Sequence, residues 1–187
     1  MPIPAPWSEL TADEKRTRTL EVADDLFARE GVDVAMPVLA GAIGVGVGSI
    51  YRQVGTKDDL IAALVISRAE DLRVRFTGAL DGADPWEALV AATHETVDDC
   101  LDDALSQSAW DAAASVSDEV RAARQGATDA LAALVERAHA SGALRADASH
   151  EDLRIVFCAL RDLKGIGRDA GHRLAELALR GMAATPS

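Results

Sequence analysis

The spacing of hydrophobic residues along the chain is helical nearly throughout. Leu20, Ala23, Leu26 and Phe27, for example, recur at three- and four-residue intervals, which places them on one stripe of an amphipathic helix. No segment shows the two-residue alternation of a half-buried strand, and no internal repeat is visible. The pattern predicts an all-α fold of about nine helices, at residues 12–30, 36–43, 47–54, 57–80, 85–103, 108–115, 118–141, 150–164 and 168–182.

Local signals mark several of the predicted helix ends. Gly31 closes the first helix, as glycines often do at helix C-termini. Thr56 and Asp59 have the spacing of a capping box, so a helix should begin at residue 57. Asp84 before Pro85 is an N-cap followed by a proline in the first turn. The three prolines of residues 1–11 indicate a loose arm before the first helix.

Residues 36–54 have the spacing of a helix-turn-helix, with two short helices around Gly44. Glycine suits that turn because it enters positive φ without a steric cost. Leu39, Ile43, Val45 and Ile50 can then form the small core that the two helices share.

Composition bounds the class of protein. The 187 residues fit one domain, or one with a small appendage, and 49% of them are hydrophobic. The aromatic residues, three Phe, three Trp and one Tyr, are few for a β-rich domain. No apolar run is long enough to cross a membrane, and residues 1–6 lack the features of a signal peptide. Cys100 and Cys158 are the only cysteines, so we expect no disulfide framework and a cytoplasmic protein.

The net charge of −12 opposes nucleic-acid binding by the chain as a whole. The charge is unevenly spread, however, because no acidic residue lies between Asp33 and Asp58, where Arg52 and Lys57 stand. Lys57 also lies at the N-terminus of the next helix, where free backbone N–H groups favour a phosphate. A further basic cluster, Lys15, Arg16 and Arg18, opens the first long helix.

The second short helix, residues 47–54, is the candidate recognition helix. Such helices present their N-terminal residues to base edges, where Arg pairs with guanine and Gln with adenine. Tyr51 can alternatively pack in the small core, Arg52 can be a solvated charge, and the basic cluster before residue 19 can be a generic helix start. The predicted DNA contacts are Arg16, Arg18, Val47, Gly48, Ser49, Tyr51, Arg52, Gln53 and Lys57.

Over residues 16–64, the sequence resembles the TetR family of bacterial transcriptional repressors. The matching residues are LEVADDLFAREG at residues 20–31, Leu39-Ala40, Ile43-Gly44-Val45, Gly48-Ser49-Ile50-Tyr51-Arg52 and Thr56-Lys57-Asp58-Asp59-Leu60. The resemblance implies a homodimer whose two C-terminal helices form a four-helix bundle with those of its partner. It also implies a palindromic operator and a small molecule that releases the protein from DNA.

The resemblance divides the chain into a DNA-binding domain, residues 12–56, and a ligand-binding and dimerisation domain, residues 57–187. Ligand pockets are mostly apolar, and the candidate lining residues are Phe76, Trp86, Thr93, Val97, Cys100, Trp110 and Phe157, with plain core packing as the alternative. The candidate dimer interface, with packing inside one subunit as its alternative, is Val156, Leu160, Leu163, Leu174, Leu177 and Gly181.

Some positions depart from the family pattern. Ala35 and Pro37 stand where Ser or Thr and a polar residue are usual, Gly46 replaces a common Ser cap, and Val47 replaces a frequent Lys or Arg. Gln53 and Val54 likewise replace a frequent aromatic pair. These losses, together with the net charge of −12, motivate a second hypothesis: a TetR-fold helical dimer that binds a ligand or protein partner but has lost DNA binding.

The remaining motifs do not indicate catalysis. No nucleophile–base pair is visible, and the glycines of residues 44–48 follow no strand, so they do not read as a phosphate loop. His94 and Asp98 have the i, i+4 spacing that a metal site uses, but their acidic helix is more simply a solvated face. We therefore expect no enzyme activity, no metal and no cofactor, with operator DNA, a second copy of the chain and an unknown small-molecule effector as partners.

Overall fold

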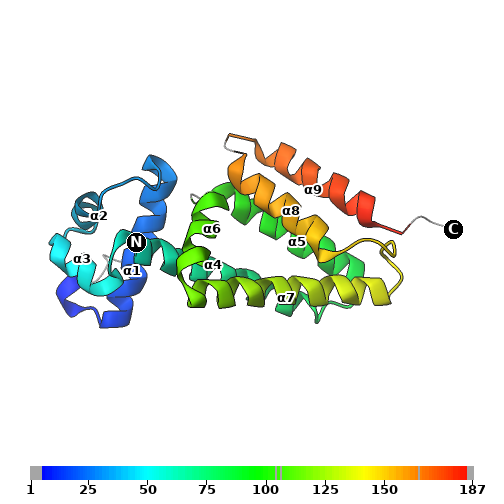
Figure 1. The fold of residues 1–187 in the computed structure, drawn as a ribbon, viewed down its shortest axis with the longest axis horizontal. Helices are drawn as coiled ribbons and strands as arrows, with labels where there is room; N and C mark the ends of the chain where they lie inside the picture. Colours follow the sequence, from blue (N-terminus) through cyan, green and yellow to red (C-terminus); the bar gives the residue numbers. More distant parts are fainter. Residues whose placement is uncertain (1–5, 104, 106, 164, 185–187) are drawn as a thin grey trace. The chain divides into compact units, whose positions relative to one another are not determined.

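The structure, a computed structural model, describes residues 6–103, 105, 107–163 and 165–184 (Figure 1). Over these residues it contains nine α-helices, one 3-10 helix at Trp7–Glu9 and no strand, which confirms the predicted all-α fold. The helices are α1 (Ala12–Glu30), α2 (Met36–Ile43), α3 (Val47–Val54), α4 (Lys57–Ala79), α5 (Pro85–Asp102), α6 (Gln107–Val116), α7 (Asp118–Ala140), α8 (His150–Asp162) and α9 (Arg168–Met182).

The helix ends form where the local signals predicted them. Gly31 follows α1 with a φ of 85°, in the region that favours glycine. Before α4, the Thr56 N–H donates to Asp59 Oδ2 over 2.8 Å and the Asp59 N–H donates to Thr56 Oγ1 over 3.2 Å, which completes the capping box. Asp84 accepts from the N–H of Trp86 over 2.8 Å at the start of α5. These bonds satisfy backbone donors that a helix leaves unpaired at its N-terminus.

Two predicted segments differ from the structure. Residues 7–9 of the predicted loose arm form a 3-10 helix, because the N–H of Glu9 donates to the Pro6 carbonyl over 2.9 Å; residues 1–5 lie outside the described residues. The helix predicted to end at Lys164 ends at Asp162, and Lys164 itself lies outside the described residues. Leu163 leaves the helical backbone region, with φ −81° and ψ 67°, although its N–H still reaches the Ala159 carbonyl.

The chain divides into two units between Val65 and Ile66, and α4 contributes to both. In the first unit α1, α2 and α3 contact one another around a small core. Ala23 and Phe27 of α1, Leu39 of α2 and Ile50 of α3 are buried there. The predicted functional boundary after residue 56 lies at the start of α4, within this first unit.

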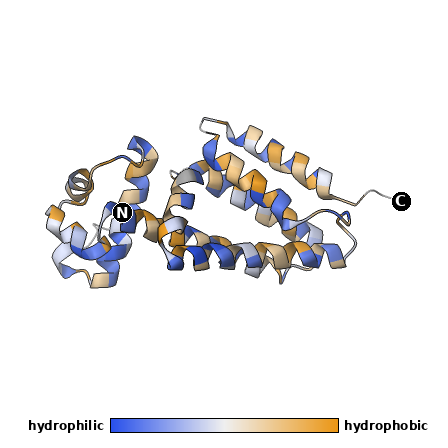
Figure 2. Ribbon diagram, in the orientation of Figure 1, coloured by the Kyte–Doolittle hydropathy of each residue, from blue (hydrophilic) through white to orange (hydrophobic). Residues whose placement is uncertain are grey.

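In the second unit α5 lies at the centre and packs against α7, α8 and α9. The helices bury one continuous apolar cluster, in which Leu89, Leu134 and Leu153 have no exposed surface. Each long helix carries both hydrophobic and hydrophilic residues along its length (Figure 2), as expected for helices that pack on one face. Within the described part of the chain, no helix has the length and apolarity that crossing a membrane requires.

Candidate nucleic-acid interface and effector pocket

The turn between α2 and α3 depends on Gly44. Its backbone is left-handed, with φ 81° and ψ 34°, and its N–H donates to the Ala40 carbonyl over 3.0 Å. The Val45 N–H donates to that same carbonyl over 3.0 Å, so the end of α2 and the start of the turn share one acceptor. A side chain at position 44 would strain this backbone, which explains why the sequence places glycine there.

One face of α3 is fixed against the rest of the first unit. Ile50 and Val54 are buried, as are Leu39 and Ile43 of α2, which packs against α3; Val45 is half-buried. From α1, Arg16 Nη1 donates to the Gln53 carbonyl over 3.1 Å. A guanidinium at this end of α3 satisfies a carbonyl in the last turn and suits the helix dipole.

The opposite face of α3 points to solvent. Val47 is 38% exposed and Tyr51 is 49% exposed, so Tyr51 lies outside the small core. Arg52 is exposed as well, and its Nη2 donates to Ser49 Oγ over 3.0 Å within the same helix. Gly48 is exposed between them, which leaves this face open to an approaching backbone. The face thus carries an apolar side chain, a phenol and a guanidinium within two turns.

The other predicted DNA contacts lie around this face to different degrees. Arg16 is exposed but already bound to Gln53, whose side chain is half-buried. Arg18 and Lys57 are half-buried. At the N-terminus of α4, the backbone N–H of Thr56 and then its hydroxyl hold the pKa of Asp59 below its usual range.

In the part of the chain that the structure describes, the helices α2 and α3 lack side-chain N-caps, as the sequence indicated. Gly46 and Ala35 make no side-chain capping bond among the described residues, at the starts of α3 and α2 respectively. The backbone N–H groups in the first turn of α3 are therefore not bonded by a side chain of the N-cap residue.

The second unit contains a cavity of about 90 Å³ between α4, α6, α7 and α8. Its apolar wall includes three of the predicted ligand residues, Phe76, Trp110 and Phe157, and the rings of Phe76 and Phe157 stack with centroids 6.5 Å apart. The apolar wall is completed by Leu72, Ala127 and Leu131.

The other four predicted ligand residues lie away from this wall. Val97 and Cys100 belong to the apolar cluster, Trp86 packs against it, and Thr93 is buried. The Thr93 hydroxyl donates to the Leu89 carbonyl over 2.7 Å within its own helix. Burial raises the pKa of the Cys100 thiol to about 11, so this group stays protonated at neutral pH.

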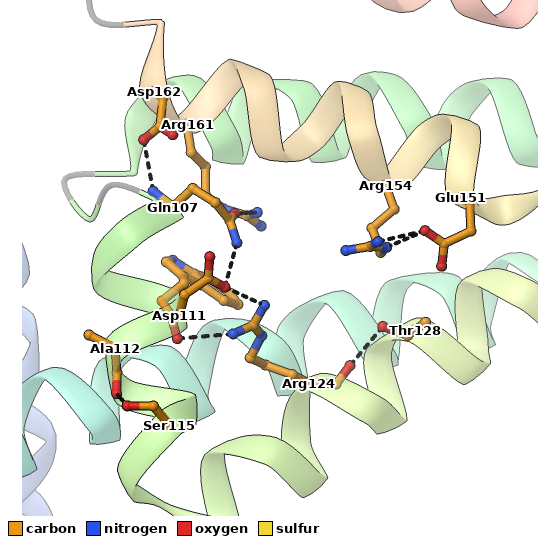
Figure 3. A network of polar contacts seen from close by, with 11 residues as sticks. Gln107, Asp111, Ala112, Ser115, Arg124, Thr128, Glu151, Arg154, Arg161 and Asp162 are labelled. Atoms are coloured by element: carbon orange, nitrogen blue, oxygen red, sulfur yellow. Dashed lines mark hydrogen bonds and ion pairs between the residues drawn. The ribbon is translucent and has the colours of Figure 1, made fainter.

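The sequence did not indicate the polar part of the cavity, which is lined by Gln107, Arg124, Thr128, Arg154, Cys158 and Arg161. Arg124 of α7 and Arg161 of α8 both point toward α6 (Figure 3). Their guanidiniums lie 6.0 Å and 4.2 Å from the ring centroid of Trp110. Residues 37 positions apart on different helices follow no sequence period, so no local signal could have paired them.

Hydrogen bonds connect these arginines into one network. Arg161 Nη1 donates to Gln107 Oε1 over 3.1 Å, Gln107 Nε2 donates to Asp111 Oδ1 over 3.0 Å, and Arg124 Nη2 donates to that same oxygen over 3.0 Å (Figure 3). At the rim, Arg154 pairs with Glu151 over 2.6 Å. The network fixes the direction in which each guanidinium points.

Asp103, which does not line the cavity, is a buried carboxylate that contacts side chains of α4, α6 and α8. Its Oδ1 lies 2.8 Å from Nη1 of Arg68 on α4, and its Oδ2 accepts from Trp110 Nε1 over 3.0 Å. The same Oδ2 lies 3.6 Å from Nε of Arg161. Asp103 thus connects two residues of the cavity wall to α4.

The predicted dimer residues fall into two groups. Val156 and Leu160 are buried within the subunit's own core, and Leu174 is half-buried. Leu163 is 44% exposed, Leu177 is 52% exposed, and Gly181 is exposed. Ile155 of α8, which was not among the predicted dimer residues, is 63% exposed.

His94 and Asp98, the pair considered for a metal, contact a third residue from α9. Nδ1 of His172 lies 2.8 Å from Nδ1 of His94, and Nε2 of His172 lies 3.0 Å from Asp98 Oδ1. Burial raises the pKa of Asp98, but hydrogen bonds from His172 and Arg168 outweigh it and lower the pKa overall. No group of three such side chains is placed to hold a metal ion in the described residues.

Known proteins resemble this chain in both units. Residues 20–64 match the family model for bacterial regulatory proteins of the tetR family, and residues 84–184 match the model for the C-terminal domain of SbtR-like transcriptional regulators. Among solved structures, the TetR transcriptional regulator SCO0520 from Streptomyces coelicolor is 31% identical, with a TM-score of 0.69, over 91% of this chain and 99% of that one.

Curated relatives match over a shorter region. The HTH-type transcriptional regulators SrpR and TtgW of Pseudomonas putida are each 32% identical over 87 residues, or 46% of this chain. The match covers 41% of SrpR and 65% of TtgW, less than two thirds of either protein. The two family models together span most of the chain. Both describe transcriptional regulators rather than enzymes. The chain therefore belongs to the TetR family of transcriptional regulators.

Proposed function

We propose that this regulator is a ligand-responsive repressor that binds a palindromic operator as a homodimer, in the cytoplasm. The observation that carries the DNA-binding part is the solvent face of α3, where Val47, Tyr51 and Arg52 are exposed on a helix fixed by Ile50 and Val54. A helix held in this way can enter the major groove with its exposed side chains directed at the bases. The acid-free stretch from residue 34 to residue 57 removes local repulsion of phosphates.

The exposed faces of α8 and α9 support the homodimer. On α8 and just after it, Ile155, Ala159 and Leu163 are exposed at intervals of four residues, so they share one side. On α9, Leu177 and Gly181 are exposed with the same spacing. Large apolar side chains on adjacent helices favour a self-complementary interface, and a twofold dimer would present two copies of α3 to two half-sites.

The experiment that tests this function is a mobility shift of the purified protein on DNA flanking its own gene, over a series of salt concentrations. We expect a discrete complex that resists competitor DNA and weakens as salt rises, because each phosphate contact releases counterions. The matched pair of variants is Arg52→Ala and Arg29→Ala. Arg29 is an exposed arginine of α1 whose Nε donates to the Asp25 carbonyl over 3.2 Å, so it controls for the loss of one positive charge.

The second candidate is a TetR-fold dimer that no longer binds DNA. It is favoured by the starts of α2 and α3, where Ala35 and Gly46 provide no side-chain cap, and by the net charge of −12. A folded dimer that gives no complex at low salt, both on the flanking DNA and in a selection from genomic fragments, would establish this candidate and overturn DNA binding.

A further inference from the structure

We infer that the second unit binds a small organic acid, whose acid group is held by Arg124 and Arg161 and whose apolar part lies against Phe76 and Phe157. The inference rests on the proposed function only in making this acid the effector. The binding site itself follows from the cavity, its charges and its size.

The charge of the cavity wall is the first argument. Three arginines line it, and no carboxylate does so among the described residues, in a chain whose net charge is −12. The carboxylates that pair with these arginines, Asp103, Asp111 and Glu151, are not among the residues that line the cavity. The guanidiniums thus form part of the cavity wall, whereas their partner carboxylates do not.

The state of Arg161 is the second argument. Its side chain is 8% exposed, and its Nε is buried without a hydrogen-bond partner in the described part of the chain. Asp103 lies 3.6 Å from that nitrogen, too far for a good hydrogen bond. A buried donor without an acceptor costs free energy, so the fold keeps a guanidinium here although its pairing with Asp103 is incomplete. Because a guanidinium carries five N–H donors in a fixed fork, its bond to Gln107 leaves other donors for an acid group.

A purely structural role for the arginines is the competing explanation, since the network also ties α6, α7 and α8 together. That role explains the bonds to Gln107 and Asp111. It does not explain an apolar cavity beside the guanidiniums, where further packing would stabilise the fold more than an empty space does. The combination of an aromatic wall with fixed cationic donors is what recognition of an amphipathic anion requires.

The size of the cavity restricts the acid to a short one. At about 90 Å³ it is smaller than the ~150 Å³ cavity that encloses benzene in another protein. An acid with one ring or a short chain needs small shifts of the lining side chains. A long acyl chain needs a larger rearrangement.

The same contacts give the ligand a route to α4. An acid group on Arg161 competes with Asp103, which lies 2.8 Å from Arg68 of α4 and accepts from Trp110. The helix α4 begins at Lys57, two residues after α3 and its C-cap glycine. A ligand alters DNA binding only if it binds two states of the protein with different affinity, and the Asp103 contacts are groups that such states can exchange.

The test is calorimetry on the full-length protein with benzoate, hexanoate and phenyl phosphate, each compared with a neutral counterpart: benzamide, hexanamide and benzyl alcohol. We expect at least one acid to bind at least tenfold more tightly than its counterpart. Benzoate against phenyl phosphate distinguishes carboxylates from phosphates. The inference is overturned if no acid binds more tightly than its neutral counterpart.

The location of the site is tested with Arg124→Gln and Arg121→Gln. Arg121 lies one turn earlier on α7, is 52% exposed and does not line the cavity, so it is the matched control. We expect Arg124→Gln to raise the Kd of the acid about tenfold or more and Arg121→Gln to change it less than twofold. Equal effects of the two variants would place the acid elsewhere and overturn the assigned site.

A readout that needs no variant comes from the cysteines. Cys158 lines the cavity and is half-buried, whereas the pKa of Cys100 is raised to about 11 by burial, so Cys158 should react with iodoacetamide first. We expect the bound acid to slow this reaction at least fivefold; an unchanged rate would overturn the assigned site.

Acid binding that leaves the DNA complex intact would keep the site and overturn its role as effector site, which separates the two proposals.

Discussion

Arginine serves opposite purposes in the two units. In the first unit Arg52 is exposed, and its bond to Ser49 stays within one turn of α3. In the second unit Arg161 is buried among residues of several helices, with Gln107, Trp110 and Asp103 around its guanidinium. Removing an exposed arginine lowers the stability of the folded protein only slightly, whereas removing a buried, paired arginine lowers it strongly. The first fits the proposed contact with DNA, and the second fits the proposed ligand site, which the fold already holds in place.

This comparison predicts its largest effect at Asp103. Asp103→Ala removes a carboxylate that is 4% exposed and leaves Arg161 buried beside Trp110. Breaking a buried ion pair costs about 3–5 kcal/mol, so we expect the free energy of unfolding to fall by that amount in urea denaturation followed by circular dichroism. Asp111→Ala is the control, since Asp111 is 61% exposed and should cost less than about 1 kcal/mol. Similar losses in the two variants would contradict the distinction between buried and exposed charges.

The second prediction concerns Arg52→Ala, for which DNA binding and stability should respond differently. If Arg52 contacts a guanine, its loss costs about 1–3 kcal/mol of operator binding and relaxes specificity at one base pair. The free energy of unfolding should change by less than about 0.5 kcal/mol, because the side chain is exposed. Mobility shifts on operator variants measure the first quantity, and urea denaturation measures the second. A loss that is equal on every DNA sequence would instead make Arg52 a phosphate contact.

The two units also differ in how much of them the sequence predicted. The end of α2 and the start of α4 were predicted correctly because the signals are local: Gly44 needs a left-handed backbone, and Thr56 and Asp59 cap each other within one turn. The solvent face of α3 follows from the same short period, although the sequence left open whether Tyr51 packs in the core.

The cavity could not be predicted in this way. Thr93, Val97 and Cys100 were selected because they lie on the inward-facing stripe of α5, and they are buried without lining the cavity. Phe76, Trp110 and Phe157 were added as aromatic residues that could join this stripe; they are buried too, but they line the cavity. Whether an apolar helix stripe faces a cavity or a neighbouring helix depends on tertiary packing, which no single helix encodes. The arginines were missed for a related reason, because charged residues are expected on the surface unless a specific partner is known.

The third prediction concerns two glycines whose backbones support the recognition helix. Gly44 has a φ of 81°, and an added Cβ would meet nothing within 4 Å, so Gly44→Ala should cost only the backbone strain of about 1–2 kcal/mol. At Gly55, with a φ of 71°, an added Cβ would overlap Asp59 Oδ2 and disturb the capping box. Gly55→Ala should therefore destabilise the protein more than Gly44→Ala in urea denaturation. The reverse order would show that the α2–α3 turn tolerates less than the start of α4.

The smallest predicted effect is the pH dependence contributed by Asp98, where charges are exposed rather than buried. Burial raises its pKa, but hydrogen bonds from His172 and Arg168 outweigh this effect, so the pKa in the folded protein lies below its usual value. A carboxylate with a lowered pKa stabilises the fold above its unfolded pKa, and that contribution disappears as the pH falls through the folded value. Since the Asp98 side chain is 42% exposed, solvent screening limits the contribution to about 0.2–1 kcal/mol. Asp98→Asn should thus lower the free energy of unfolding at pH 6 and match the unsubstituted protein near pH 2. A difference that persists at pH 2 would mean that Asp98 acts through packing rather than through its charge.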